Sequence, residues 1–374
     1  MISNEKYNTK RNEKIISSKP IKVLMLPDCR QANPYQFLLA DALEKQGVEV
    51  SFFNEYRRVF PLLRTLINQQ HNFDVIHLHW ILPFVKGKSW YTKTIYAVKF
   101  LLELIVLKCV GIRMVWTIHN CVTHDTNFPQ LELWIRRKLA WLADSLILHN
   151  RETMKDLANE YNFDLHKATA ISHGHYRQVY QKSIDSQQAR QKLNLPISGN
   201  IYLHLGLLRP YKGIENLLQV WQDNQFSFKE DTLVIAGKPS KDYKQKLEQL
   251  IFRSNIILIP QFIENEEIHL FFSAATAVVL PYISLLNSGS LILAMSYGKP
   301  IIAPKLGSIP EVLGEANTLL YDPEDYHGLL EAMKTIPHID LKKLSQQVTQ
   351  VCDSLDWNFI ANQTKKVYQT AITQ

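Results

Sequence analysis

Two cationic side chains stand three residues apart in the segment LHLGLLRPYKG, residues 203–213. An apolar run from Ile201 leads into this segment and ends at Gly206, so we expect a strand followed by a turn that carries Arg209 and Lys212. Cations at such a turn can bind a phosphate group. An isolated basic loop would instead leave both side chains in solvent, so the interpretation depends on the rest of the chain.

A second turn of similar chemistry lies in LLNSGSLILAMSYGKP, residues 285–300. Small polar residues there precede an apolar helical stretch, and the free amides of a helix N-terminus bind anions. Serine or asparagine at a helix start is also explained by ordinary capping. Two such turns after strands of one sheet together predict a phosphate site. Its candidate residues in this turn are Asn287, Ser288, Gly289, Ser290 and Leu291.

Histidines follow several predicted strands of the first half of the chain. His77 alternates with His79 on one strand, and we expect His77 inside the sheet. The candidates expected to face a cleft or an acceptor are Asn33, His79, His119, Asn120, His124, His173 and His175. A zinc site is conceivable, but no H-E-x-x-H pattern or cysteine companion accompanies these histidines, so we predict no metal site.

Standard nucleotide motifs are absent from the sequence. It contains no G-x-G-x-x-G, no P-loop and no D-x-D. Sugar transfer that depends on a metal commonly uses a D-x-D carboxylate pair to hold the ion. We therefore expect a diphosphate bound by cationic side chains and a helix N-terminus, with no metal and no other cofactor.

Short apolar runs alternate with amphipathic stretches along nearly the whole chain, which is typical of α/β proteins with parallel sheets. The alternation pauses in a polar stretch at 181–200 that we interpret as an interdomain linker. We predict a disordered tail at 1–20, doubly wound domains at 21–185 and 186–355, and a final helix at 356–374 that returns to the first domain. Strands are expected at 21–26, 48–53, 74–80, 112–118, 145–149, 201–205, 232–237, 255–259, 276–281 and 299–304.

The composition is that of a globular protein of more than one domain. The chain has 374 residues, 46% hydrophobic and 21% charged, with a formal net charge of +7. The positive charge favours anionic partners, and no motif indicates nucleic acid. The cysteines form no disulfide framework and no signal peptide is evident, so we expect a cytoplasmic protein. The apolar stretch 97–112 is interrupted by charges and predicts a buried or surface-lying helix, not a membrane span.

The ordered series of motifs resembles family 4 glycosyltransferases, which are retaining enzymes of the GT-B fold. The segments GLLRPYKGIENLL and PYISLLNSGSLILAMSYGKPIIAPKLGSIPEVL are similar to the donor domain of that family. NPYQFLLADAL, DVIHLHW, WTIHNCVTHD and SHGHYRQVY resemble the first domain of its bacterial exopolysaccharide-type members, in particular a cyanobacterial envelope-polysaccharide group. The resemblance covers nearly the whole chain after the tail and implies two Rossmann-like domains that face a central cleft.

The resemblance also implies roles for individual residues. Lys212 matches the lysine that binds the donor diphosphate, and Arg209 serves in place of an arginine that commonly follows the glycine directly. His119 matches a histidine that faces the donor sugar. Further donor contacts are implied at Gly206, Lys238, Phe262 and Ile263. The family often carries two glutamates eight residues apart at the second turn, and here Leu285 and Leu293 stand in those positions, so the ribose contact must differ.

By this resemblance the chain moves a hexose from a nucleotide-sugar to a sugar acceptor. We expect a lipid-linked acceptor, because the basic surface and the apolar helix suit a peripheral membrane enzyme. We expect UDP-glucose first and GDP-mannose second as donor, with the departing phosphate helping to take the acceptor's proton. One alternative is a non-catalytic nucleotide-sugar-binding protein of the same fold. Another is an epimerase, which would need positioned carboxylates that the sequence does not reveal.

Overall fold

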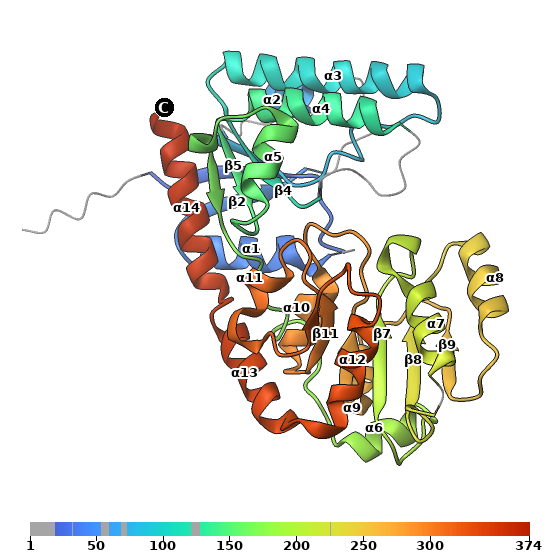
Figure 1. Ribbon diagram of the computed structural model, residues 1–374. Coiled ribbons are helices and arrows are strands. Elements are labelled where there is room, and N and C mark those ends of the chain that lie inside the picture. The colour runs from blue at the N-terminus through green and yellow to red at the C-terminus, as the bar shows by residue number, and fades with distance from the viewer. Residues whose placement is uncertain (1–18, 32, 54–59, 69–72, 121–127, 225) are drawn as a thin grey trace, which may run out of the picture.

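The computed structural model describes residues 19–31, 33–53, 60–68, 73–120, 128–224 and 226–374. Two parallel six-stranded sheets form the centres of two α/β domains, one above the other in Figure 1. The predicted tail lies outside the described residues except for its last two positions, and so does His124. The predicted boundary between residues 185 and 186 falls between the last strand of the first sheet and the first helix of the second domain.

The first sheet has the strand order β2-β1-β3-β4-β5-β6. Its five longer strands coincide with predicted apolar runs, and the short edge strand was not predicted. The strands are β1 (Ile21–Leu26), β2 (Val48–Phe52), β3 (Val75–Leu78), β4 (Arg113–Ile118), β5 (Ser145–Leu148) and β6 (Ala168–Ala170).

Helices cover both faces of this sheet. Val23 and Met25 of β1 are buried in one core with α1, whereas Leu24 and Leu26 are buried in the other with α3. This alternation of two apolar faces explains why the strand reads as a continuous apolar run. The helices are α1 (Pro34–Glu44), α2 (Pro61–Asn68), α3 (Trp90–Cys109), α4 (Pro129–Leu142) and α5 (Met154–Tyr161).

The second sheet has the order β12-β11-β10-β7-β8-β9. Its first five strands in the sequence were predicted, and the two-residue edge strand was not. The strands are β7 (Ile201–Leu205), β8 (Thr232–Ala236), β9 (Ile256–Ile259), β10 (Ala277–Val279), β11 (Ile301–Pro304) and β12 (Leu320–Tyr321). Because β7 lies between β10 and β8, the turns after β7 and β10 emerge side by side at the carboxyl edge of the sheet.

The helices of the second domain connect these strands. They are α6 (Ser186–Lys192), α7 (Ile214–Asp223), α8 (Lys241–Leu250), α9 (Ile268–Ala274), α10 (Gly289–Ser296), α11 (Ile309–Leu313), α12 (Gly328–Thr335) and α13 (Leu341–Asp353). A short 3₁₀ turn, η2 (Pro210–Lys212), precedes α7 and contains the predicted phosphate lysine.

The last helix, α14 (Trp357–Thr373), returns to the first domain as predicted. It lies against α1, and the Tyr368 hydroxyl is 2.7 Å from Nδ1 of His77, which is buried in the first sheet (Figure 1). Asp356 caps the helix by accepting hydrogen bonds from the amides of Asn358 and Phe359. The chain therefore crosses between the domains twice.

Candidate functional site

The turn after β7 brings a glycine, a lysine and a serine together. Gly206 has φ +144°, and a Cβ there would lie 2.8 Å from both Nζ of Lys212 and Oγ of Ser290. Only a residue without a side chain leaves that space open between the two turns. The two motifs, whose Lys212 and Ser290 are 78 residues apart in the sequence, thus meet around Gly206.

Lys212 is buried at this meeting point with 6% of its surface exposed. Its Nζ lies 3.4 Å from Oγ of Ser290 and 5.7 Å from the ring centre of Tyr282. Burial, and then the charge of Arg209, lowers the pKa of Lys212 to about 8. Within the described part of the chain Lys212 forms no ion pair, so this buried ammonium lacks a carboxylate partner, and an anion would stabilise its charged form.

Arg209 holds the loop around the lysine. Its guanidinium donates to the carbonyl oxygens of Leu208 at 2.8 Å and Lys238 at 3.2 Å, which joins the turn after β7 to the turn after β8. The side chain of Lys238, a predicted donor contact, is exposed. Arg209 therefore contributes positive charge beside Lys212 while it also fixes the loop.

The N-terminus of α10 forms the other wall. Ser288 caps the helix by accepting from the amide of Leu291 at 3.0 Å, and its Oγ lies 2.7 Å from the Tyr282 hydroxyl. The Leu291 amide is thus used within the helix, which leaves the amides of Gly289 and Ser290 at the helix start. A Cβ at Gly289 would contact only the Tyr176 hydroxyl, at 3.6 Å, so the fold itself does not require a glycine there.

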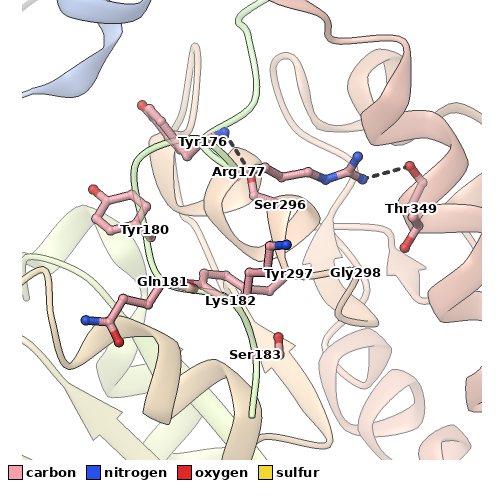
Figure 2. Close-up of a pocket in the computed structure, with 10 residues that line it drawn as sticks. All are labelled: Tyr176, Arg177, Tyr180, Gln181, Lys182, Ser183, Ser296, Tyr297, Gly298 and Thr349. Atoms are coloured by element: carbon pink, nitrogen blue, oxygen red, sulfur yellow. Dashed lines mark hydrogen bonds between the residues drawn. The ribbon is translucent and has the colours of Figure 1, made fainter.

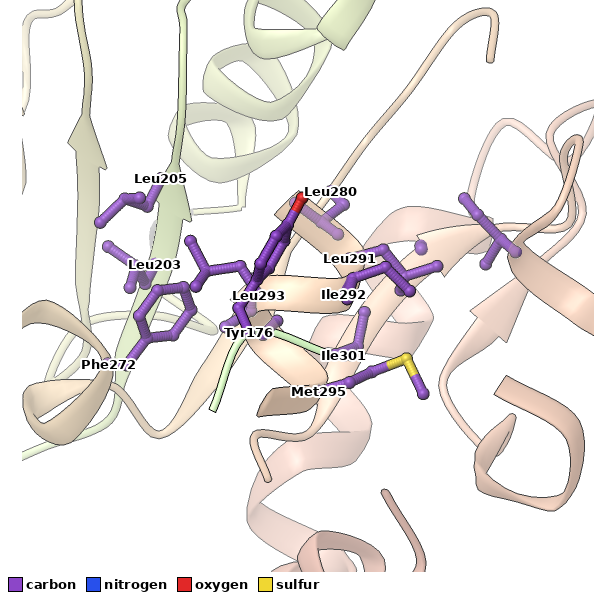
Figure 3. Close-up of a cluster of buried hydrophobic side chains, with 14 of the residues drawn as sticks. Tyr176, Leu203, Leu205, Phe272, Leu280, Leu291, Ile292, Leu293, Met295 and Ile301 are labelled. Atoms are coloured by element: carbon purple, nitrogen blue, oxygen red, sulfur yellow. The ribbon is translucent and has the colours of Figure 1, made fainter. Parts of the chain in front are cut away.

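Apolar packing fixes the position of α10. Leu291, Ile292, Leu293 and Met295 are buried in one apolar cluster with residues of the strands, among them Leu203 and Ile301 (Figure 3). Leu293 occupies one of the two positions where the resembling family often has glutamate. A ribose contact from that side chain is therefore replaced by core packing.

The two residues predicted to contact the base differ in exposure. Phe262 is exposed and its ring is available for stacking, whereas Ile263 is buried in the donor-domain core. Only Phe262 can therefore offer a side-chain surface to a ligand in this conformation.

Asn287 connects the two domains. Its Nδ2 donates to the carbonyl oxygen of His119 at 3.1 Å, and its Oδ1 accepts from Nδ2 of Asn150 at 3.3 Å. Asn287 was predicted as a donor contact, but its amide is engaged by the first domain here. The contact brings His119, which by the resemblance faces the donor sugar, to the N-terminus of α10.

Three histidines form a hydrogen-bonded chain at the ends of neighbouring strands. His79 comes directly after β3, His119 directly after β4 and His149 directly after β5. Nδ1 of His79 lies 3.2 Å from Nε2 of His119, whose Nδ1 lies 3.1 Å from Nε2 of His149. Nδ1 of His149 lies 3.0 Å from the carbonyl oxygen of Ile171.

The carbonyl at one end fixes the proton positions along this chain. Because Ile171 can only accept, neutral His149 carries its proton on Nδ1, and the same tautomer follows in turn for His119 and His79. Nε2 of His79 is then a buried acceptor without a hydrogen-bond partner among the described residues. Both ring nitrogens of His119 are occupied, so it is held firmly in one orientation.

Burial keeps the whole cluster uncharged. It lowers the pKa of His149 to about 4 and that of His173 to about 3, with His149 contributing to the latter. The pKa values of His79 and His119 also fall well below the ordinary histidine value, first through burial and then through neighbouring histidines. Tyr35 packs against four of these rings, with centroid separations of 4.8–5.7 Å.

The remaining predicted residues have structural contacts. Asn33 caps α1 by accepting from the amide of Tyr35 at 3.0 Å, and the carbonyl of Asn120 accepts from Arg136 at 2.9 Å. His173 lies 3.2 Å from the Tyr176 hydroxyl beside α10. The carbonyl of His175 accepts from the indole of Trp357 at the start of α14.

Sequence reasoning missed His149, Tyr35 and Glu311. Oε2 of Glu311 accepts from the amide of Arg151 at 2.7 Å and is a further contact between the domains. His149 had a detectable signal, because it follows a predicted strand as His79 and His119 do. The positions of Tyr35 and Glu311 depend on the packing of distant segments, and no local pattern marks them.

Two cavities flank the domain contact. One of about 310 Å³ lies at the linker and the carboxyl end of α10, where the Tyr176 amide bonds to Ser296 and Arg177 bonds to the carbonyl of Thr349 (Figure 2). Another, of about 500 Å³, is lined by His149, Glu311 and neighbouring residues. Lys212 lines neither cavity. The candidate diphosphate site is therefore separate from both and lies at the N-terminus of α10.

No group of three or more histidine, cysteine, aspartate or glutamate residues in the described regions is arranged to hold a metal ion. The histidine chain is explained by its mutual hydrogen bonds. In the same regions no helix has both the length and the apolar character needed to cross a bilayer.

Comparison with known proteins supports a glycosyltransferase. Residues 185–350 match the family described as "Glycosyl transferases group 1". A GDP-mannose:glycolipid 4-beta-D-mannosyltransferase of Xanthomonas campestris is 28% identical over 91% of this chain and 89% of its own length. A D-inositol 3-phosphate glycosyltransferase of Corynebacterium glutamicum is 23% identical over 80% of this chain and 73% of its own length.

Solved structures establish the fold as GT-B. Sucrose-phosphate synthase from Thermosynechococcus elongatus superposes with a TM-score of 0.71 at 16% identity, covering 94% of this chain and 98% of the other. Anabaena HepE in complex with UDP and glucose gives 0.69 at 18% identity, covering 92% and 98%. The fold expected from the sequence is therefore confirmed, whereas the exopolysaccharide and cyanobacterial subgroup stays a prediction.

Proposed function

We propose that the chain transfers a hexose from a nucleotide-sugar to a lipid-linked sugar acceptor in extracellular polysaccharide synthesis. The observation that carries this proposal is the buried ammonium of Lys212, which faces Ser290 across Gly206 without a carboxylate partner in the described regions. A diphosphate between the two turns would supply the missing negative charge. The match to group 1 glycosyl transferases over residues 185–350 supports the same ligand.

The site suits a reaction in which a diphosphate departs. When the bond between the anomeric carbon and the phosphate oxygen breaks, negative charge grows on the nucleoside diphosphate. We propose that Lys212, with Arg209 beside it, and the first amides of α10, those of Gly289 and Ser290, stabilise that charge. Such groups accelerate the reaction because they interact more strongly with the transition state than with the ground state.

Two donors are proposed for testing. The sequence favoured UDP-glucose over GDP-mannose, and the Anabaena neighbour was solved with UDP-glucose at 16% identity. The Xanthomonas relative is named for GDP-mannose and is 28% identical over most of both chains. That relative supports GDP-mannose as the first donor to test, and its glycolipid acceptor supports a lipid-linked acceptor here.

We propose the retaining route that the resemblance implies, with the departing phosphate receiving the acceptor's proton. One observation favours an inverting route instead: the relative is named as a 4-beta-D-mannosyltransferase, and mannose is α-linked in GDP-mannose. An inverting enzyme would need a base, and Nε2 of His79, a buried acceptor without a hydrogen-bond partner among the described residues, is the candidate in the first domain. The anomeric configuration of the product distinguishes the two routes.

We also propose that transfer needs no metal, because protein cations and helix amides are available for the diphosphate and the sequence has no D-x-D. Activity should then persist in EDTA. Loss of activity in EDTA that magnesium or manganese restores would refute this part of the proposal. The free cysteines Cys29, Cys109 and Cys352 suit the cytoplasmic location that we propose, on the inner face of the plasma membrane.

The test of the function is a donor screen. Purified protein is incubated with UDP-glucose, GDP-mannose and other nucleotide-sugars, with and without a bacterial glycolipid extract, and the released UDP or GDP is measured. We expect release from one donor that increases with the extract, and a sugar-modified lipid by mass spectrometry. Nucleotide binding without any release would instead identify a non-catalytic nucleotide-sugar-binding protein.

A further inference from the structure

The outward face of α3 is apolar, although this helix lies at the surface. Figure 1 shows α3 along the edge of the first domain farthest from the donor domain. The exposed residues, with 40% to 69% of each residue's surface accessible, are Tyr91, Ile95, Val98, Leu102 and Ile105. Their spacing of four, three, four and three residues places them on one side of the helix. An exposed apolar stripe of this length is typical of an interaction surface.

Two of the four charged residues of α3, Lys93 and Glu103, are turned away from solvent. Lys93 is buried, and its Nζ pairs with Oε1 of Glu132 on α4 at 2.6 Å. Glu103 is also buried and accepts from the amide of Leu62 at 2.9 Å. An ordinary surface helix exposes its charges and buries its apolar side chains. In α3 these two charged side chains are buried, whereas the five apolar residues of the stripe are exposed.

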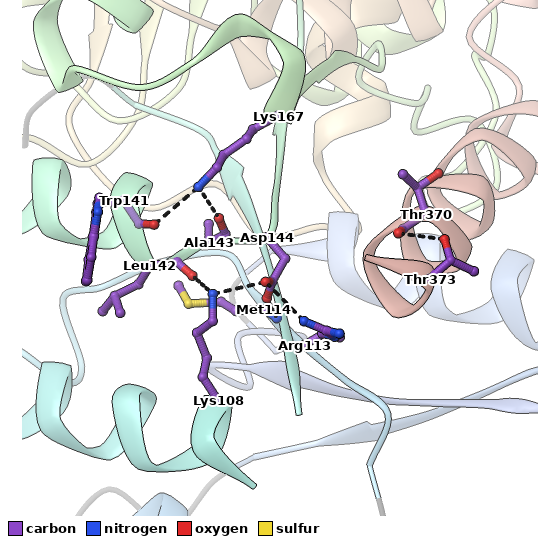
Figure 4. A network of polar contacts seen from close by, with 10 residues as sticks. All are labelled: Lys108, Arg113, Met114, Trp141, Leu142, Ala143, Asp144, Lys167, Thr370 and Thr373. Atoms are coloured by element: carbon purple, nitrogen blue, oxygen red, sulfur yellow. Dashed lines mark hydrogen bonds and ion pairs between the residues drawn. The ribbon is translucent and has the colours of Figure 1, made fainter. Parts of the chain in front are cut away.

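Helix α4 extends the apolar surface beside α3. Trp134 and Trp141 are seven residues apart on α4, and both are exposed, Trp141 by 68%. The backbone that carries Trp141 is fixed, because Lys167 donates to the carbonyls of Trp141 and Ala143, and Lys108 donates to that of Leu142 (Figure 4). The end of α4 is therefore well bonded at its backbone, while Trp141 itself is largely exposed. We call these exposed residues of the two helices the α3–α4 face.

The charges that remain on these two helices are positive where they reach solvent. Their only carboxylates, Glu103 and Glu132, are each 1% exposed. Arg137 and Lys138 of α4 are exposed, and Lys88 is exposed just before α3. A surface of apolar and aromatic side chains with basic neighbours is complementary to an anionic lipid bilayer.

We propose that the α3–α4 face docks on an anionic phospholipid surface, with Tyr91, Trp134 and Trp141 at the headgroup level and Leu102 and Ile105 reaching the acyl boundary. The identification of the bilayer rests in part on the proposed function, because a lipid-linked acceptor lies in a membrane. A second copy of the chain is disfavoured as the occupant, since a symmetric pairing would bring the same basic residues together. Docking by this face leaves the donor domain in water, where nucleotide-sugars are dissolved.

Sedimentation with lipid vesicles tests the proposal. Full-length protein is mixed with vesicles of phosphatidylcholine alone or with phosphatidylglycerol, at low and high salt, and the bound fraction is measured. We expect binding to the anionic vesicles that weakens in high salt, and a decrease of about tenfold or more in Leu102→Glu, because a charge replaces an inserted apolar side chain. Tyr326→Glu, an exposed aromatic change on the donor domain, is the matched control and should bind as the wild type does.

Three outcomes would overturn the proposal: no binding to anionic vesicles, equal binding by Leu102→Glu and wild type, or a dimer in sedimentation velocity that Leu102→Glu abolishes without any vesicle binding. Nucleotide-sugar hydrolysis in solution separates this proposal from the proposed function. Hydrolysis should be the same in Leu102→Glu and wild type, and its absence in both would refute the transferase while leaving vesicle binding to decide the docking surface.

Discussion

Replacing Lys212 by methionine should make the protein more stable and nearly inactive. Methionine keeps the length and apolar stem of the side chain but removes its charge. Burial lowers the pKa of Lys212 from 10.5 to about 8. At 1.36 kcal/mol per pKa unit, this corresponds to about 3 kcal/mol by which the buried ammonium destabilises the free protein. The side chain is 6% exposed, so solvent screening removes little of this value.

The sign of the effect sets its pH dependence. Between pH values of about 8 and 10.5 the unfolded chain holds a proton on Lys212 that the folded protein has released. The wild type therefore gains stability as the pH rises through this window, while below about pH 8 the full cost remains. The advantage of Lys212→Met should be largest, up to about 3 kcal/mol, at pH 7 and should vanish toward pH 10.5.

The same change should cost most of the activity. Removal of one group that stabilises the departing oxyanion typically lowers the rate by about 100- to 1000-fold. Urea unfolding at pH 7 and pH 10 gives the stability, and nucleotide release gives the rate. Lys299→Met is the matched control: burial also lowers the pKa of Lys299 to about 8, but its Nζ donates to the carbonyl of Ala275 at 2.9 Å, outside the site. That variant should keep nucleotide affinity, and a Lys212→Met protein with activity within about threefold of wild type would refute the reasoning.

Three further predictions follow from the site. Gly289→Val should weaken UDP or GDP binding strongly by crowding the phosphate oxygens, whereas Ser290→Ala, which keeps its amide, should weaken it modestly; equal wild-type affinities in calorimetry would place the nucleotide elsewhere. His149→Phe should free the His119 ring and shift the pH profile of kcat more than that of KM. An unchanged profile would mean that the histidine chain has only a structural role. Acid should destabilise the protein, because the pKa values of His149 and His173 are about 4 and 3 and between pH 6.5 and 5 the unfolded chain takes up protons that the folded protein does not. Each histidine should lower the free energy of unfolding by about 2 kcal/mol over that range. A urea midpoint that stays constant from pH 6.5 to 5 would contradict this prediction.

The sequence was sufficient to predict the strands that end at functional residues. Apolar runs such as 201–205 and 145–149 are buried on both faces, and this burial gives them a clear signal. The edge strands β6 and β12 span three and two residues and carry no such run, so only pairing with their neighbours defines them. Short edges of a sheet therefore stay hidden from local patterns.

The candidate site was foreseen in part for the same reason. Arg209 and Lys212 could be placed at a turn, because a glycine and a strand precede them. The occupied nitrogens of His119 could not be foreseen, since they depend on β3, β4 and β5 lying side by side. The engagement of Asn287 by His119 and Asn150 depends on how two domains meet, which no single segment encodes.

The central claim is that a nucleoside diphosphate binds beside Lys212, and proton uptake on binding tests it most directly. UDP and GDP are titrated into the protein by calorimetry at pH 8 in buffers of different ionisation enthalpy. A pKa of about 8 means that about half of the free protein lacks this proton, and a bound diphosphate would restore it. We expect uptake of a fraction of a proton per nucleotide, on the order of one half, in the wild type and none in Lys212→Met. Tight binding with no proton uptake, or uptake that persists in Lys212→Met, would contradict it.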